Sequence, residues 1–389
     1  MATNEYQGGF SLSMSFRGRS LLRRNQVVSM EQVQEQELHE LDLFHSHVAD
    51  RLLSLLPSDS PKHPLENPPS PLSLAFLSKL LDTLLAVEAE FRPLLPLLGS
   101  GPSGAAAASR PVADLLDRAV KSLDLCNAVS FSLHSLRHWL RHAQIATSAL
   151  LSPSPHLAAA HLLRARRALS KLLPSDGASG IRTERTGSFG RRETNSRFLS
   201  WSMSRNCSAH LAAPRGSEGG ARELAVAVYT MSAVMVFAMW ALGAALPCQE
   251  RGGPPVAPPK QLPWAASMVA LQERIAEEWR RRDRKAAAAG LLVELQEVEG
   301  CGKVLMEVVE EASGSCAACG TSLERERAEE VAQRAAELAE ACRRLEEGLG
   351  PLERQVREVF HRVVGSRAEV LRSLGQSARS TPAPSPIAS

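Results

Sequence analysis

Three histidines at four-residue spacing are the first residues in this sequence that could do chemistry. His134, His138 and His142 share one face of a predicted helix, and imidazoles at i and i+4 can ligate a metal ion. A helical wheel places this face opposite the leucines of the same segment, and Arg137 and Arg141 lie among the histidines. Because arginine neighbours disfavour a divalent cation, we interpret this face as solvated and basic.

A Cys-x-x-Cys pair is the second candidate. Cys316 and Cys319 have the spacing of half a zinc site or of a redox pair, but no second such pair follows them. Gly314 and Gly320 flank the pair, so we interpret this cluster as a turn between helices. The sequence also lacks GxSxG, Walker A and HExxH motifs. We therefore predict no catalytic, cofactor-binding or metal-ligating residue, no cofactor, and a protein that is not an enzyme.

Basic clusters are the third group. The run at residues 280–285 contains four arginines and one lysine and could meet anionic lipid headgroups. Acidic residues precede it by one turn, which favours an exposed helix laced with ion pairs. Ser188 and Ser204 lie in arginine-rich contexts that resemble substrates of basophilic kinases, which is a hypothesis for phosphorylation. The net charge of +3 is too small to indicate nucleic acid as a partner.

The elements that must position these residues are helices. Hydrophobic residues make up 44% of the chain but aromatic residues only 4%, so leucine, alanine and valine must build the core, which favours an all-α fold. We predict a multi-helix bundle with long disordered linkers and one strongly apolar helix. The predicted segments are a disordered leader (1–29), an N-terminal helical bundle (30–174), a basic disordered linker (175–221), the apolar helix (222–247), a Pro/Gly linker (248–263), C-terminal helices (264–376) and a disordered tail (377–389).

The apolar helix is the longest uncharged stretch. Leu224 to Leu246 comprises 23 residues and ends before Pro247. A helix of that length measures about 35 Å, enough to cross a bilayer, and the arginines before it would place the N-terminal side in the cytosol. The stretch is rich in Ala and Met and contains Tyr229 and Thr230, so its drive to insert is modest. A transmembrane helix and a buried central helix of a cytoplasmic bundle both remain open.

A heptad repeat organises the C-terminal third. Apolar residues recur every seven positions from Val331 to Val359, and a second set follows four places after each. This pattern indicates a left-handed helix seam, either within the chain or with a partner. Gly348, Gly350 and Pro351 break it, so we predict two packed helices of a bundle instead of one long coiled coil.

Three blocks of this sequence resemble the plant BYPASS-related family, also called the ROH family. They are RRNQVVSMEQ near the N-terminus, AVYTMSAVMVFAMWALGAALPCQ, and PWAASMVALQERIAEEWRRRDRK followed by GLLVEL. The resemblance extends from about Tyr6 to about Leu374 and is most specific from Tyr229 to Gln249. The family has no recognised catalytic activity, so the resemblance supplies no catalytic residue.

The resemblance implies a role in development and in exocytic membrane trafficking, through binding of the Exo-seventy subunit of the exocyst. An anionic membrane surface is a second expected contact. The alternatives are a soluble regulator of the production of a mobile developmental signal, without a membrane span, and a cryptic metabolite-modifying enzyme.

Overall fold

The computed structural model describes residues 16–57, 70–99, 102–151, 159–173, 220–246, 256–283, 292–319 and 325–380, and this part of the chain consists of helices and short connecting segments, without a strand. This confirms the all-α prediction. In chain order the helices are α1 (Phe16–Leu53), α2 (Leu74–Phe91), the 3₁₀ helix η1 (Arg92–Gly99), α3 (Pro102–Leu150), α4 (Ala159–Leu172), α7 (Gly220–Ala245), α8 (Ala265–Asp283), α9 (Val293–Cys319) and α10 (Arg325–Ser380).

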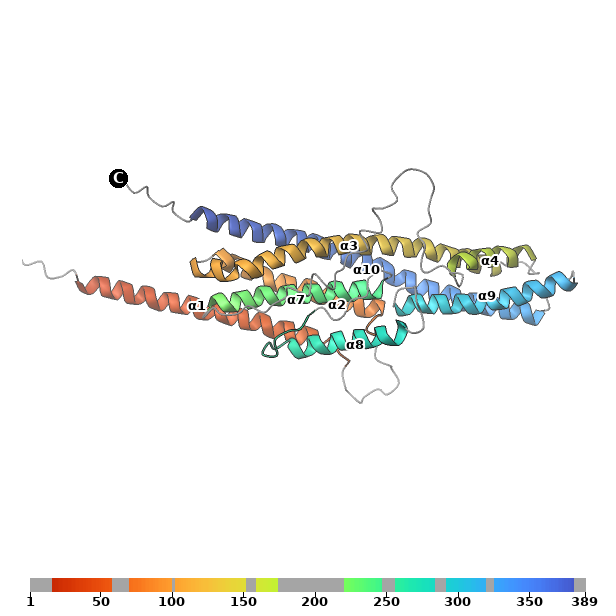
Figure 1. Cartoon of the computed structure of the whole chain (residues 1–389), viewed down its shortest axis with the longest axis horizontal. Coiled ribbons are helices and arrows are strands. Elements are labelled where there is room, and N and C mark those ends of the chain that lie inside the picture. The colour runs from red at the N-terminus through yellow and green to blue at the C-terminus, as the bar shows by residue number, and fades with distance from the viewer. Residues whose placement is uncertain are drawn as a thin grey trace, which may run out of the picture.

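The helices lie along the long axis of an elongated bundle, in which α7 lies between α3 and α1 in the view of Figure 1. Helices α1, α2, α3 and α8 surround α7, whereas α10 packs along α3, α9 and α2. The predicted N-terminal and C-terminal groups of helices therefore share one continuous hydrophobic core. A long helix can bury an apolar stripe only along its length, so the parallel packing of many helices produces this rod-like form.

Several helix ends differ from the predicted ones. Helix α1 begins at Phe16, so residues 16–29 are helical where a disordered leader was predicted. Helix α3 begins at Pro102, before the predicted start at Pro111, because the alanine run between these prolines favours a helix. Helix α10 continues to Ser380, beyond the predicted start of the tail at residue 377. Most of the basic linker, with Ser188 and Ser204, lies outside the described residues.

Helix α10 is continuous over 56 residues, so the predicted break at Gly348, Gly350 and Pro351 is wrong. Two glycines and one proline cost a helix about 5 kcal/mol in propensity. The leucine and valine seam is buried on both sides of them, and each such side chain contributes about 1.5–3 kcal/mol. The seam packs against α2, α3 and α9 of the same chain. Its buried members are Val331, Ala335, Leu338, Cys342, Leu345, Leu349, Leu352, Val356, Val359 and Val363.

A short backbone junction joins three helix ends in the middle of the bundle. The N–H of Leu292 donates to the carbonyl of Ala245 at the end of α7 (3.0 Å), and the N–H of Val293 donates to the carbonyl of Leu72 (3.1 Å). The carboxylate of Glu294 then accepts from the N–H of Leu74 in the first turn of α2 (3.0 Å). Unpaired backbone groups at helix ends need such partners when they are buried. The start of α9 therefore provides them for α2 and α7.

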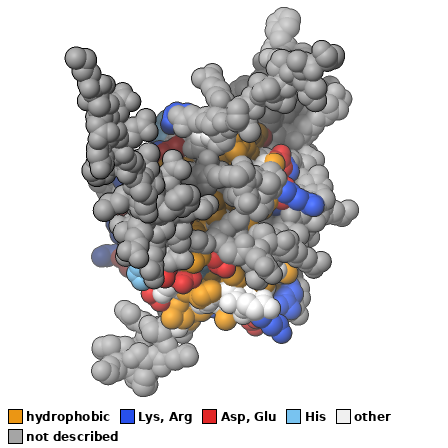
Figure 2. All heavy atoms as spheres, turned by 90° about the vertical axis from the view of Figure 1, so that its left-hand side faces the viewer, with side chains coloured by type: hydrophobic (Ala, Val, Ile, Leu, Met, Phe, Trp, Pro, Cys, Tyr) orange, Lys and Arg blue, Asp and Glu red, His pale blue; other side chains and the backbone are white. Residues whose placement is uncertain are grey.

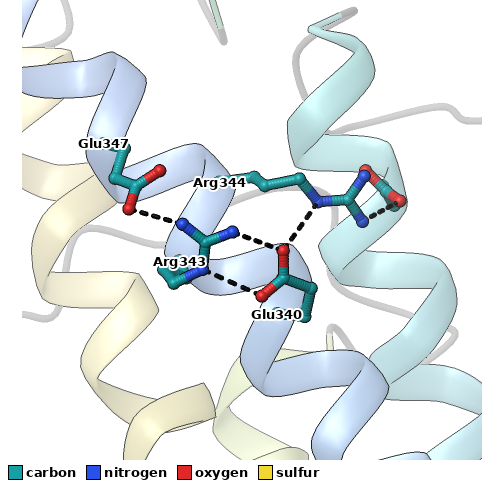
Figure 3. A network of polar contacts seen from close by, with 5 residues as sticks. Glu340, Arg343, Arg344 and Glu347 are labelled. Atoms are coloured by element: carbon teal, nitrogen blue, oxygen red, sulfur yellow. Dashed lines mark hydrogen bonds and ion pairs between the residues drawn. The ribbon is translucent and has the colours of Figure 1, made fainter.

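Ion pairs cover the outer side of α9 and α10 (Figure 3). Arg343 donates to Glu340 (2.8 Å) and to Glu347 (2.6 Å) along α10. Arg344 reaches across to Glu297 of α9 (2.6 Å). These side chains are about half exposed, so each pair contributes little stability, but together they make a charged, solvent-exposed outer face.

Gly348 lies where α10 packs against the start of α2. A Cβ atom at this position would lie 2.4 Å from Leu74 Cδ1 and 3.3 Å from Leu74 Cβ and Cγ. Leu74 is 7% exposed, so it has little space into which to move. The glycine therefore permits the packing of these two helices.

We predict that Gly348→Ala destabilises the protein by about 1–3 kcal/mol, because overpacking outweighs the gain in helix propensity. Urea unfolding followed by circular dichroism measures the change. Gly300→Ala on α9 is the matched control, since nothing lies within 4 Å of the added Cβ, and it should stabilise the helix. Equal effects of the two substitutions would contradict this account of Gly348.

Candidate functional site

The apolar helix α7 is the structural centre of the molecule and the first candidate for a functional element. Among the described residues one helix, at Glu223–Ala245, is long and apolar enough to cross a membrane, with a mean hydropathy of 1.9. Of its most apolar 18-residue segment, 94% is buried inside the bundle. A helix that is apolar on all sides needs cover on all sides, and here neighbouring helices provide it.

A buried polar cluster fixes α7 to two other helices. The side-chain hydroxyl of Thr230, which is fully buried, donates to the carbonyl of Val226 (2.9 Å) in its own helix. It accepts from Nε1 of Trp264, at the start of α8 (3.1 Å). His45 Nδ1, on α1, lies 3.3 Å from the same oxygen. A hydroxyl has one proton and two lone pairs, and Thr230 uses its proton for the carbonyl of Val226. It can therefore only accept from His45, so the neutral His45 ring must carry its proton on Nδ1.

The remaining nitrogen of His45 is buried without a hydrogen-bond partner among the described groups. Protonation of Nε2 would place a positive charge in apolar surroundings. Burial accordingly lowers the pKa of His45 from its ordinary value of 6.5, although the nearby carboxylate of Asp42 opposes the change. The cluster therefore favours a neutral histidine.

Tyr229 continues this polar region toward α3. Its ring lies 6.1 Å from that of Trp264, and its hydroxyl is buried without a partner among the described groups. Burial raises the pKa of Tyr229 to about 12, against the opposing effect of Arg118. Tyr229 and Thr230 were noted in the sequence only as polar interruptions of the apolar stretch. No local signal connects them to His45 and Trp264, which come from distant segments.

The entry to α8 is ordered by one glutamine. The side chain of Gln272 accepts from the N–H of Val256 (3.1 Å) and donates to the carbonyl of the same residue (3.0 Å). Both groups are buried, as is Trp264. The predicted Pro/Gly linker therefore ends in a fixed segment from Val256 onward, because its backbone is paired and its apolar residue is part of the core.

A second buried cluster surrounds the carboxylate of Glu88 on α2, which is 3% exposed. Arg92 lies 3.5 Å and Arg362 lies 3.3 Å from its oxygens, and the hydroxyl of Ser366 donates to it. Two cations and a hydroxyl compensate the buried charge and hold α10 against α2. Sequence reasoning missed this site, because no periodic pattern distinguishes Glu88 from an exposed glutamate.

The three histidines lie where the helical wheel placed them. His134 and His138 are exposed on α3 and His142 is partly exposed, while the leucines on the opposite side of the helix are buried. The rings of His138 and His142 are 5.8 Å apart. Within the described residues no group of three His, Cys, Asp or Glu side chains could hold a metal ion.

The cysteine pair lies within a helix and not in a turn. Cys316 and Cys319 lie in the last turns of α9, so the helix continues through the predicted turn; their side chains are outside the described part.

In the basic run, Arg281 pairs with Glu278 (2.6 Å) and Arg280 donates to the carbonyl of Ala276 (3.3 Å). The described part of this run, Arg280 and Arg281, therefore has the polar contacts expected of an exposed helix with ion pairs. Residues 284 and 285 lie outside the described range.

Comparison with known proteins gives matches along nearly the whole chain. Residues 1–374 match the family described as Protein ROH1-like. The chain is 39% identical to Protein ROH1A of Arabidopsis thaliana, over 94% of this chain and 96% of that protein. It is 33% identical to Protein ROH1D of the same plant, over 97% of this chain and 99% of that protein. No solved structure matches it.

We predict that Thr230→Val destabilises the protein by about 1–3 kcal/mol, because it leaves the buried donors of Trp264 and His45 without an acceptor. Thermal and urea unfolding measure the loss. The matched control is Thr83→Val: Thr83 is also buried, but its hydroxyl bonds only to the carbonyl of Lys79 in its own helix (2.9 Å). If the two variants were equally stable, the cluster would have no structural role.

The lowered pKa of His45 predicts a dependence of stability on pH. As the pH falls, the unfolded chain takes up this proton before the folded protein does, so the contribution of His45 to the unfolding free energy is complete above its ordinary pKa of 6.5 and decreases below it. Urea unfolding from about pH 8 to about pH 5 should show the decrease. His45→Asn should flatten this profile, whereas His39→Asn, at an exposed position, should not. Parallel profiles for all three proteins would contradict the prediction.

Proposed function

Because the chain belongs to the ROH1-like family, as the resemblance predicted, we propose that it is a non-catalytic helical interaction protein that acts in plant development and exocytic trafficking by binding the Exo-seventy subunit of the exocyst. The observation that carries this proposal is the family match over residues 1–374. The all-helical fold is compatible with it. A helical bundle suits a protein that acts by binding partners through its surface and not by catalysing a reaction.

The arrangement of apolar surface restricts where a partner could bind. The heptad seam of α10 faces α2, α3 and α9, so it is occupied within the chain. A partner must use outer faces instead. Figure 2, which looks along the bundle, shows apolar side chains at the surface among acidic and basic ones in the described part of that end. Mixed surfaces of this kind are typical of non-obligate interfaces.

We also propose that α7 remains the central helix of the bundle and does not span a membrane. Its burial and the bonds from Thr230 to Trp264 and toward His45 support this interpretation. Insertion into lipid would remove those bonds and expose the apolar stripes of α1, α2 and α3 to water. Membrane association would then be peripheral and the protein would lie on the cytosolic side.

The exocyst proposal predicts direct binding between the purified full-length chain and a purified Exo-seventy subunit. Biolayer interferometry should give saturable binding, and proximity labelling in plant cells, with tags at either end of the chain, should enrich the same subunit. Gly300→Ala serves as a folded surface variant that should bind normally. Failure of the two purified proteins to associate would overturn the proposal.

The topology proposal predicts release from membranes by alkaline carbonate, which strips peripheral proteins and leaves spanning ones. The full-length chain should appear in the soluble fraction. The Thr230→Val variant should also be released, because the loss of one polar contact does not convert α7 into a transmembrane helix. Retention of the unmodified chain in the carbonate pellet would show that α7 spans the bilayer.

A further inference from the structure

Helix α4 differs from its neighbours in the charge of its outer side. Of the α-helices in the described part of the chain, α4 alone contains no aspartate or glutamate. Its inner side is buried against α3 and α9. Its outer side exposes three cations and one leucine within an arc of about 100° around the helix axis. These residues are Leu163, Arg164, Arg167 and Lys171.

The helix that carries these residues is firmly held. Its inner stripe consists of residues that are at most 6% exposed, which are Leu162, Ala165, Ala168, Leu169 and Leu172. Trp139 of α3 donates through Nε1 to the carbonyl of Leu172 (2.9 Å), which pairs a carbonyl at the end of the helix. Arg166, on the flank of α4, lies 3.5 Å from Glu310 of α9. The outer arc is therefore presented on a fixed support.

The cations of the outer arc are not neutralised within the described structure. Arg164, Arg167 and Lys171 have no hydrogen bond or ion pair with any described residue. Several other surface arginines are paired with acids one turn away, as Arg343 is with Glu347 and Arg281 is with Glu278. The arc on α4 is thus a concentrated positive surface, whereas the long charged face of α10 is balanced.

We propose that this outer arc of α4 binds the surface of a membrane that contains anionic phospholipids. The flexible arginine and lysine side chains would contact phosphate and carboxylate groups of the lipids. Leu163, which is 46% exposed on the same arc, would enter the boundary between headgroups and acyl chains. The helix would lie flat, over a length of about 20 Å for its described residues.

The composition of the arc favours a lipid surface over an acidic protein. A stable protein interface needs a desolvated apolar centre, and one leucine among three cations is too little apolar surface for that. Peripheral membrane contact needs only a cluster of cations and a small apolar anchor. The unpaired cations of α4 favour it as the membrane contact, whereas Arg281 in the basic run of α8 is paired with Glu278.

Sedimentation of the full chain with vesicles tests this proposal. One set contains phosphatidylcholine alone and the other also contains phosphatidylserine. The unmodified chain should bind the anionic set and lose that binding at high salt. The triple variant Arg164→Gln, Arg167→Gln, Lys171→Gln should bind on the order of 100-fold more weakly, since each cation near an anionic surface contributes about fivefold. Leu163→Gln, which changes no charge, should weaken binding by about tenfold.

A matched control separates the effect of these positions on vesicle binding from the effect of the net charge of the chain. The triple variant Lys260→Gln, Arg354→Gln, Arg372→Gln removes the same charge from exposed positions elsewhere and should bind like the unmodified chain. Circular dichroism confirms that each variant is folded. Equal binding by the two triple variants would overturn the proposal and would leave α4 as a surface for an acidic protein. The vesicles contain no protein, so the result is independent of binding to the exocyst subunit.

Discussion

The need to cover α7 on every side determines the architecture of this protein. Its side chains from Leu224 to Leu246 leave no polar face that could be turned toward water. One neighbouring helix can cover only part of such a cylinder, so α1, α2, α3 and α8 must all be present. Helix α10 then covers the outer sides of α2 and α3. The bundle is therefore built outward from its most apolar element.

Polar groups inside this core give it a definite register. Apolar contacts between helices tolerate sliding, whereas the bonds of Thr230 with Trp264 and His45 are satisfied in only one arrangement. The paired backbone groups at Leu292 and Val293 and the carboxylate of Glu88 act in the same way at other points of the bundle. Apolar burial supplies most of the stability, and a small number of buried polar contacts specify how the helices are aligned.

The parts of the fold that depend on periodicity could be predicted from the sequence. The seam from Val331 to Val363 is buried as the heptad indicated, and the solvated face of His134 and His138 follows from the helical wheel. Features that depend on neighbours distant in the chain could not be predicted. Gly348 was interpreted as a helix breaker because propensity is local, whereas the structure uses its missing side chain to accommodate Leu74. The buried clusters around Thr230 and Glu88 could not be predicted for the same reason, since their members are brought together only by folding.

The position of α7 in the chain has a consequence for synthesis. Its main cover, α1, α2 and α3, is encoded before it, so these helices have already left the ribosome when α7 emerges. A segment that resembles a membrane span by hydropathy can then dock onto these three helices, and α8 completes its cover later. The order of the helices thus limits the time during which the most apolar part of the chain is exposed to the targeting and quality-control machinery of the cell.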